Sequence, residues 1–447
     1  MENTEQSIQR DAIDNVAAVI ALLYILLLAV PSTLPCNIQF CDFLAVAMLC
    51  CLAAKLRKGL SSASQHSPQL NVSIFPPTML TAYLATALMA TAFHLHFTFS
   101  QYYEWIAFAF VAFLYHFYST FRLPPRTLAI CGGAILLAVL LAFACEIIAS
   151  VAGMQSHFCF VSEQMESTEM AFLSRRFAFT FNNPNSFACF YMLPLAMVTP
   201  FVHGNDWTRR PLALRLLYFP LCLILLLPLF SSASKHGLMS LAIIASWMKP
   251  LFAIDRKWLA KLLVAGVLLA AVVFETTVLY TTFPLSSSFP FINTQPGMYT
   301  VHQRTYAKML GGHRWTMPFG MGITKAKEEY PKFADKALAK SVLERYNAMP
   351  SYENFITFMD AHNEYLNQLV LFGAIPLAML LAFLFRQARG ADGTPLLLVT
   401  AILCCCLWDD LLTKRPVWLA LAIVTSANFH IAAGKYKLAD YSIGNIP

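Results

Sequence analysis

Long apolar runs follow one another along most of this chain, and short polar connections separate them. An α-helix needs about 20 mostly apolar residues to cross a bilayer. Such runs predict twelve helices, centred in residues 13–30, 37–54, 74–97, 102–120, 127–150, 185–203, 212–230, 237–253, 258–280, 364–385, 395–412 and 416–434. The pattern therefore predicts an all-α polytopic membrane protein with about twelve transmembrane helices.

One long polar segment interrupts the apolar runs between the ninth and the tenth predicted helix. It extends from Thr281 to Ala361, which is 81 residues, and it carries nine Lys or Arg and six Asp or Glu. Within it, Val301–Leu310 predicts a short helix, Pro318–Gly322 predicts a turn, and Lys325–Tyr346 predicts an amphipathic helix interrupted at Pro331. Because long loops often carry functional residues, we expect the functional site of the protein near this segment.

The composition agrees with a membrane protein. The 447 residues are 58% hydrophobic and 12% charged, whereas soluble domains carry about 25% charged residues. The net charge of +7 is small for this length. It fits an excess of Lys and Arg on the cytoplasmic side better than a surface for nucleic acid. The cysteine spacing is not that of a metal site, and the sequence has no acidic metal-binding motif, so we predict no metal and no cofactor.

The distribution of Lys and Arg among the short connections predicts the orientation. If the N-terminus is cytoplasmic, the basic connections, such as those at 55–58 and 249–261, are cytoplasmic as well. Both termini then lie in the cytoplasm and the long loop lies outside. We accordingly expect helices 1–9 in residues 1–280, an external loop domain in 281–361, and helices 10–12 with a cytoplasmic tail in 362–447.

That orientation leaves a few cations in the short connections of the outer side. They are Arg175, Arg176, Lys235, Lys414 and Arg415. Each of them alone is explained as a charged side chain at a helix end. Together they favour an anion site, because Arg175 and Arg176 precede an Asn-Pro-Asn turn that ends at Asn185, and Lys235 lies in a short Ser-rich turn. An anion held at this face of a membrane suggests a lipid phosphate.

His362 lies where the long loop becomes the tenth predicted helix, about level with the outer headgroups. A neutral imidazole in that place can accept a proton from a hydroxyl group. The alternative interpretation is a histidine that caps a helix or lies in the interface. Other histidines on or near the outer side are His94, His96, His236, His302 and His313. Farther along the chain, Asp409 and Asp410 followed by Lys414 and Arg415 predict a local ion-pair cluster.

Several motifs occur in a defined order along the second half of the chain. They are the turn from Arg176 to Asn185, the step from Ser231 to Lys235, Gln303–Tyr306, Pro318–Gly322, His362–Leu366 and Phe372–Leu377. In these motifs the chain resembles the O-antigen ligase family, within the superfamily that also holds O-antigen polymerases and protein O-oligosaccharyltransferases. The resemblance covers roughly residues 170 to 420.

The resemblance implies glycosyl transfer on the periplasmic face of the bacterial inner membrane, so that the external loop is periplasmic. A glycan linked to undecaprenyl pyrophosphate is the donor, and a sugar hydroxyl of lipid A–core is the acceptor in the lipid bilayer. His362 is implied as the general base, with Arg304 and Lys235 stabilising the pyrophosphate without a metal. Lesser candidates for substrate binding are Arg175, Arg176, Asn185, Asn363, Lys414 and Arg415. The family usually has Arg where this chain has Lys235, and Lys keeps the charge but loses bidentate geometry.

Three alternatives stay open at this point. A polymerase that joins repeat units would use the same carrier and the same base, so only the acceptor separates it from a ligase. A transporter or flippase of lipid-linked glycans would favour inverted repeats and midplane charges, and the sequence has no evident internal symmetry. A purely structural membrane protein is disfavoured by the long cationic loop.

Overall fold

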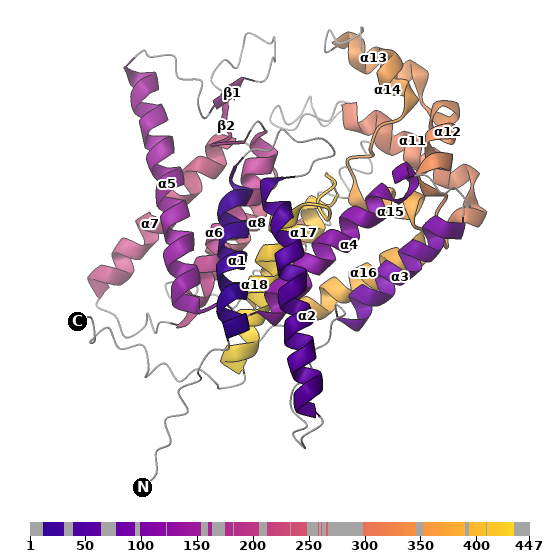
Figure 1. The fold of residues 1–447 in the computed structure, drawn as a ribbon. Helices are drawn as coiled ribbons and strands as arrows, with labels where there is room; N and C mark the ends of the chain where they lie inside the picture. Colours follow the sequence, from indigo (N-terminus) through magenta and orange to yellow (C-terminus); the bar gives the residue numbers. More distant parts are fainter. Residues whose placement is uncertain are drawn as a thin grey trace. The chain divides into compact units, whose positions relative to one another are not determined.

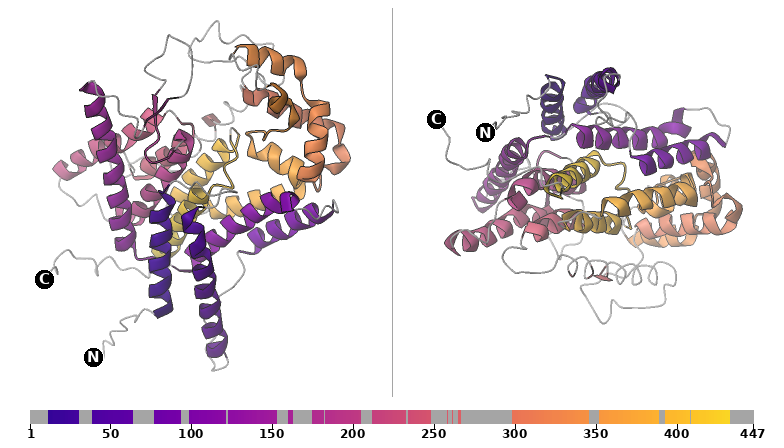
Figure 2. Two further views of the ribbon diagram at one scale, coloured as in Figure 1. Left: turned by 45° about the horizontal axis from the view of Figure 1, so that its top comes forward. Right: turned by 90° about the horizontal axis from the view of Figure 1, so that it is seen from below.

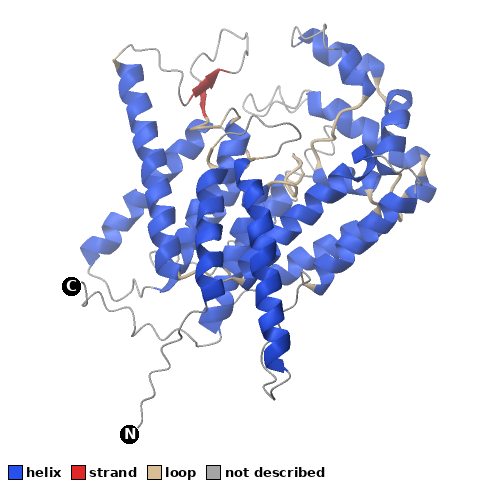
Figure 3. Cartoon of the chain, in the orientation of Figure 1, coloured by secondary structure: helices blue, strands red, loops and turns tan. Residues whose placement is uncertain are grey.

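The computed structural model describes fourteen continuous segments of the chain and four isolated residues. The segments are 12–30, 39–63, 77–93, 99–121, 123–152, 160–162, 175–181, 183–204, 212–232, 234–247, 298–345, 352–388, 393–407 and 409–432, and the isolated residues are 258, 261, 265 and 266. Helices dominate these segments (Figures 1 and 3), which confirms the prediction of a helical protein. Two three-residue strands, β1 (Phe160–Ser162) and β2 (Arg175–Phe177), were not predicted and pair antiparallel.

The chain divides into two compact units. Unit 1 holds residues 1–76, 113–253 and 419–447, and unit 2 holds residues 77–112 and 254–418. Two helices contribute residues to both units, α4 (Phe99–Thr120) and α18 (Arg415–Ala432).

Unit 1 contains the short 3-10 helix η2 and six further helices in the part of it that the structure describes. They are η2 (Phe40–Phe43), α1 (Ala12–Leu28), α2 (Leu44–Ala63), α5 (Pro125–Val151), α6 (Pro184–Gly204), α7 (Leu212–Ser232) and α8 (Gly237–Trp247). Helix α5 lies close to α6, because a Cβ on Gly132 would meet the carbonyl oxygen of Pro194 at 2.8 Å. The Trp247 indole of α8 donates to the Thr199 hydroxyl of α6 at 3.0 Å, so a buried polar contact fixes that pair of helices.

Unit 2 holds the polar loop and the apolar helices beside it. Its helices are α3 (Thr78–Phe93), α11 (Met298–Gly312), η5 (Arg314–Thr316), α12 (Gly322–Phe333), α13 (Lys336–Arg345), α14 (Tyr352–Thr357), α15 (Glu364–Leu371), α16 (Ala374–Gln387) and α17 (Thr394–Cys405). Both views of Figure 2 show the orange helices of the polar loop gathered together. Val301, Ala339, Val342, Leu343 and Phe355 form their buried core.

The predicted helix at 364–385 is wrong in one respect, because the chain breaks it into α15 and α16 at Gly373. The φ angle of Gly373 is +91°, and a Cβ there would lie 2.4 Å from the backbone nitrogen of Gly320. The predicted turn at Pro318–Gly322 fills this break, since Met321 N–H donates to Val370 O and Ala374 N–H donates to Met317 O, both at 2.7 Å. A contact between segments about fifty residues apart therefore ends the helix.

Other boundaries differ as well. The predicted run at 395–412 is helical only up to Cys405, which leaves Asp409 outside the helix. The amphipathic segment divides at Ala334 and Asp335, whereas Pro331 lies inside α12. The predicted helix at 258–280 lies outside the described residues apart from four positions.

Two described helices are long and apolar enough to cross a membrane. They are α5, with 27 residues, and the 20 residues Pro184–His203 of α6. Seven further apolar helices in the described part of the chain have only 10 to 17 residues. Helices occupy most of the predicted positions, but the number of membrane crossings stays a prediction.

Candidate functional site

The residues predicted for the site fall into two groups, one in each unit. Arg175, Arg176, Asn185 and Lys235 belong to unit 1. Arg304, His362, Asn363, Lys414 and Arg415 belong to unit 2.

The backbone at His362 is held in an unusual conformation. Its φ angle is +47°, in the left-handed region that few residues other than glycine adopt. Asn363 follows as the N-cap of α15, where its Oδ1 accepts from Leu366 N–H at 3.1 Å and its Nδ2 donates to Leu407 O at 3.0 Å. Gln303 Nε2 donates to the carbonyl oxygen of His362 at 3.3 Å. A non-glycine residue kept at positive φ by several bonds is typical of functional sites.

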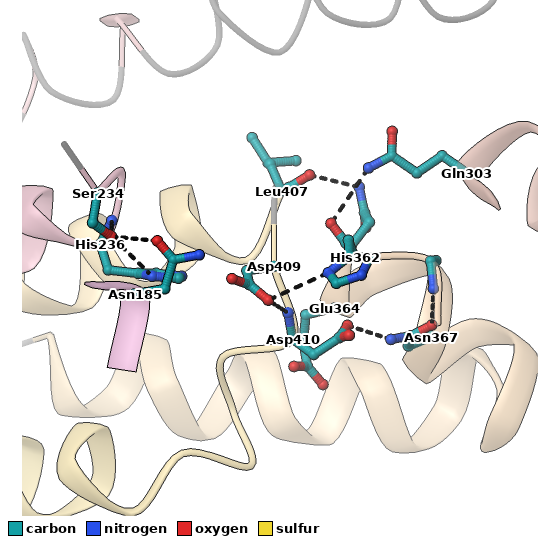
Figure 4. A network of polar contacts seen from close by, with 12 residues as sticks. Asn185, Ser234, His236, Gln303, His362, Glu364, Asn367, Leu407, Asp409 and Asp410 are labelled. Atoms are coloured by element: carbon teal, nitrogen blue, oxygen red, sulfur yellow. Dashed lines mark hydrogen bonds and ion pairs between the residues drawn. The ribbon is translucent and has the colours of Figure 1, made fainter. Parts of the chain in front are cut away.

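The His362 imidazole faces a carboxylate that the sequence did not predict for it (Figure 4). Asp409 Oδ1 lies 3.7 Å from His362 Nδ1, and the two side chains are 15% and 29% exposed. A carboxylate at Nδ1 favours a proton there, which leaves Nε2 as the nitrogen with a free lone pair. The sequence signal was the Asp409–Asp410 pair directly after an apolar helix, which we interpreted as a local ion-pair cluster.

The segment that carries Asp409 is bonded to the start of α15. Asn367 Nδ2 donates to Asp410 Oδ1, and Asn367 Oδ1 accepts from Ala361 N–H at 3.1 Å. Glu364, which is 2% exposed, accepts from Leu412 N–H at 3.0 Å. These contacts hold Asp409 in place opposite His362 (Figure 4).

Three of the side chains around His362 have the chemistry of a cation site. Ligand atoms of His362, Asp409 and Asp410 all lie within 4.8 Å of one another. One imidazole nitrogen and two carboxylates suit several divalent cations. The arrangement can therefore serve as a carboxylate–histidine pair or as a metal ligand set, and we predicted the metal-free case.

The other histidines considered for the base have partners of their own or lie elsewhere. His302 is buried, and its Nδ1 lies 2.5 Å from the Tyr330 hydroxyl. Burial, and the positive charge that His362 carries when it is protonated, lower the pKa of His302 to about 4. His313 Nε2 lies 3.1 Å from Glu329 Oε2. His236 is buried in unit 1. His94 and His96 lie outside the described residues.

The cations of unit 2 occupy different surroundings. Arg304 follows Gln303 in α11 and is half-buried. Partial burial of Asp335 raises its pKa, but a hydrogen bond from Leu338 N–H, the Lys308 ammonium at 3.0 Å and the Arg304 charge outweigh this and lower it.

Lys414 and Arg415 lie at the start of α18. Lys414 is exposed. Arg415 is half-buried, and its guanidinium carbon lies 5.5 Å from the centre of the Phe110 ring. Both cations lie a few residues after Asp410 in the chain.

In unit 1 the structure joins two motifs that the sequence presented separately. Ser234 Oγ donates to Asn185 Oδ1 at 2.8 Å, and His236 N–H donates to Ser234 Oγ at 3.3 Å (Figure 4). Asn185 is the second residue of α6, and His236 directly precedes α8. Two helix N-termini therefore meet with Lys235, which is half-buried, in the turn between α7 and α8. Helix N-termini and a cation together favour an anion.

Arg175 and Arg176 form most of strand β2, where they pair with Ser162 and Val161 of β1. Their backbone leads into the turn before α6.

No protein-family model matches the chain, and no curated protein matches it.

Proposed function

We propose that this protein is an O-antigen ligase of the bacterial inner membrane. The observation that carries the proposal is the His362–Asp409 pair, in which a histidine with left-handed backbone faces a carboxylate. The proposal includes twelve membrane spans, cytoplasmic termini and a periplasmic site. The apolar helices would then surround the polyprenyl chain of the donor.

In the proposed reaction, His362 Nε2 accepts the proton of a sugar hydroxyl on lipid A–core. The hydroxyl oxygen forms a bond to the anomeric carbon of the donor's reducing-end sugar. The bond between that carbon and the phosphate oxygen breaks, and its electron pair leaves with undecaprenyl pyrophosphate. Asp409 keeps the Nδ1 proton in place and stabilises the imidazolium that forms.

The developing charge on the pyrophosphate calls for cations. We assign Lys235 and Arg304 to this role, with Arg175, Arg176, Lys414 and Arg415 as lesser candidates. The role of Lys235 is supported by the N-termini of helices α6 and α8, because each helix N-terminus adds partial positive charge. Asn185 supports that turn through Ser234.

The experiment that tests the proposal is lipopolysaccharide banding in a strain that lacks this protein. We expect the O-antigen ladder to disappear while the carrier-linked polymer is retained, and the wild-type protein to restore the ladder. A core carrying a single repeat unit would instead identify a polymerase. An intact ladder would reject both functions.

A further inference from the structure

We propose that the Tyr299 ring is the platform on which the acceptor sugar stacks beside His362. The inference deepens the proposed function, on which it rests for the identity of the acceptor. It concerns the second residue of α11, which the sequence analysis did not single out.

The geometry places two rings side by side at the surface of unit 2. The ring centres of Tyr299 and His362 are 4.1 Å apart, and their planes are tilted by 48°. Tyr299 is 47% exposed, and the His362 side chain is 29% exposed. Both rings are therefore accessible to a molecule in solution.

The other ring side chains of α11 are buried, unlike Tyr299. Val301, His302 and Tyr306, on the following turns, are buried, and each is at most 1% exposed. An exposed aromatic ring alone is common on protein surfaces. Tyr299 differs because its ring contacts the proposed base.

The chemistry of the three neighbouring groups fits a sugar. One face of a pyranose ring presents C–H groups, which pack on the electron-rich face of an aromatic ring. Its edge carries hydroxyl groups, which donate to carboxylates and to a neutral imidazole nitrogen. The Tyr299 ring and the Asp409 carboxylate each lie next to the His362 imidazole. A sugar stacked on Tyr299 would direct one hydroxyl toward His362.

A competing explanation is that Tyr299 only packs against His362 and holds it in position. That role would affect kcat, because the base would be misplaced. A platform would affect acceptor binding, because the sugar would lose its contact surface. The two explanations therefore predict different measurements.

The test uses the full chain in detergent and, as the probe, core oligosaccharide released from lipopolysaccharide by mild acid. Calorimetry should show that the wild-type protein binds this oligosaccharide and that Tyr299→Ala weakens binding about tenfold. Tyr299→Phe and Tyr299→Trp should bind like the wild type, because they keep the ring. Trp315→Ala is the matched control, since Trp315 is 98% exposed in the same unit and should be dispensable.

Transfer kinetics complete the test. Tyr299→Ala should raise KM for lipid A–core about tenfold, with kcat and the donor KM nearly unchanged. A wild-type protein that does not bind the oligosaccharide, or equal binding by Tyr299→Ala, overturns the platform. So does a fall in kcat at unchanged acceptor KM. If binding depends on Tyr299 and the wild type transfers no glycan, the platform stands and the ligase proposal fails.

Discussion

Asp409 Oδ1 lies 3.7 Å from His362 Nδ1, so the segment after α17 presents a carboxylate to the imidazole at the start of α15. The distance is longer than a hydrogen bond. It is within the range of an ion pair, in which the carboxylate can stabilise a protonated imidazole. In the proposed function His362 is the general base and Asp409 orients it, and each role has its own mutational test.

His362→Ala should abolish glycan transfer while the protein reaches the membrane at normal levels. General base catalysis contributes about 10²–10⁴-fold to a rate. Transfer assays on membranes with matched amounts of protein measure the loss. His313→Ala is the control, because His313 pairs with Glu329, and this variant should remain active. Near-normal transfer by His362→Ala would place the base elsewhere.

Asp409→Asn should lower kcat by about ten- to hundredfold, because the imidazolium that forms loses the attraction of the carboxylate, and such a pair of charges about 4 Å apart is worth about 1–4 kcal/mol. An amide can also hold the imidazole in the wrong tautomer. The KM values for donor and acceptor should change little, since Asp409 is proposed to act through His362. Steady-state kinetics on the purified variant separate the two effects. A change confined to KM would contradict an orienting role.

Apolar runs indicated most helix positions, because each run is a local property of the chain. The break at Gly373 was not predictable in this way, since it depends on the distant turn that includes Gly320. The approach of Asp409 to His362 likewise joins two non-helical segments that lie far apart in the chain.

The candidate site shows the same limit. The sequence indicated that His362, the turn that ends at Asn185 and the Ser-rich turn with Lys235 are chemically unusual. It did not indicate that Ser234 bonds to Asn185, because 49 positions separate them. Local patterns thus identify candidate groups, whereas long-range packing decides which groups meet.

A chelator tests whether a metal is needed. We expect purified protein to transfer glycan in excess EDTA, because cations such as Lys235 and Arg304 can neutralise the pyrophosphate. The cluster of His362, Asp409 and Asp410 makes this a strict test, since its ligand atoms lie within 4.8 Å of one another. Activity that is lost in EDTA and restored by Mg²⁺ or Mn²⁺ would assign these residues to a metal.

Cysteine labelling tests the orientation. A single cysteine at Lys336, an exposed residue at the start of α13, should react with an impermeant maleimide once the outer membrane is permeabilised. A cysteine at Gly390, in the connection between α16 and α17, should react only after the inner membrane is opened. The control is the cysteine-reduced protein that carries neither of the two added cysteines. The reverse pattern would place the loop in the cytoplasm and reject the periplasmic site.

Lys235 is the position where this chain differs from the family it resembles, and substitutions there test the anion site of unit 1. If Lys235 supplies charge to the pyrophosphate, Lys235→Arg should keep most of the activity. Lys235→Ala and Lys235→Gln should lose about ten- to hundredfold, because a hydrogen bond to a charged group is worth about 1.5–3 kcal/mol.

The surroundings of Lys235 make these substitutions informative. Its neighbours Ser234 and His236 are engaged with Asn185 and with each other, so the turn has little freedom to offer another side chain. Lys340→Ala is the control, because Lys340 is exposed and only 3.9 Å from Glu344 in a surface pair. Transfer assays in matched membranes compare all four variants. Equal activity in the three Lys235 variants would show that the side chain merely reaches the headgroups, and Arg304 would then be the cation assigned to the pyrophosphate.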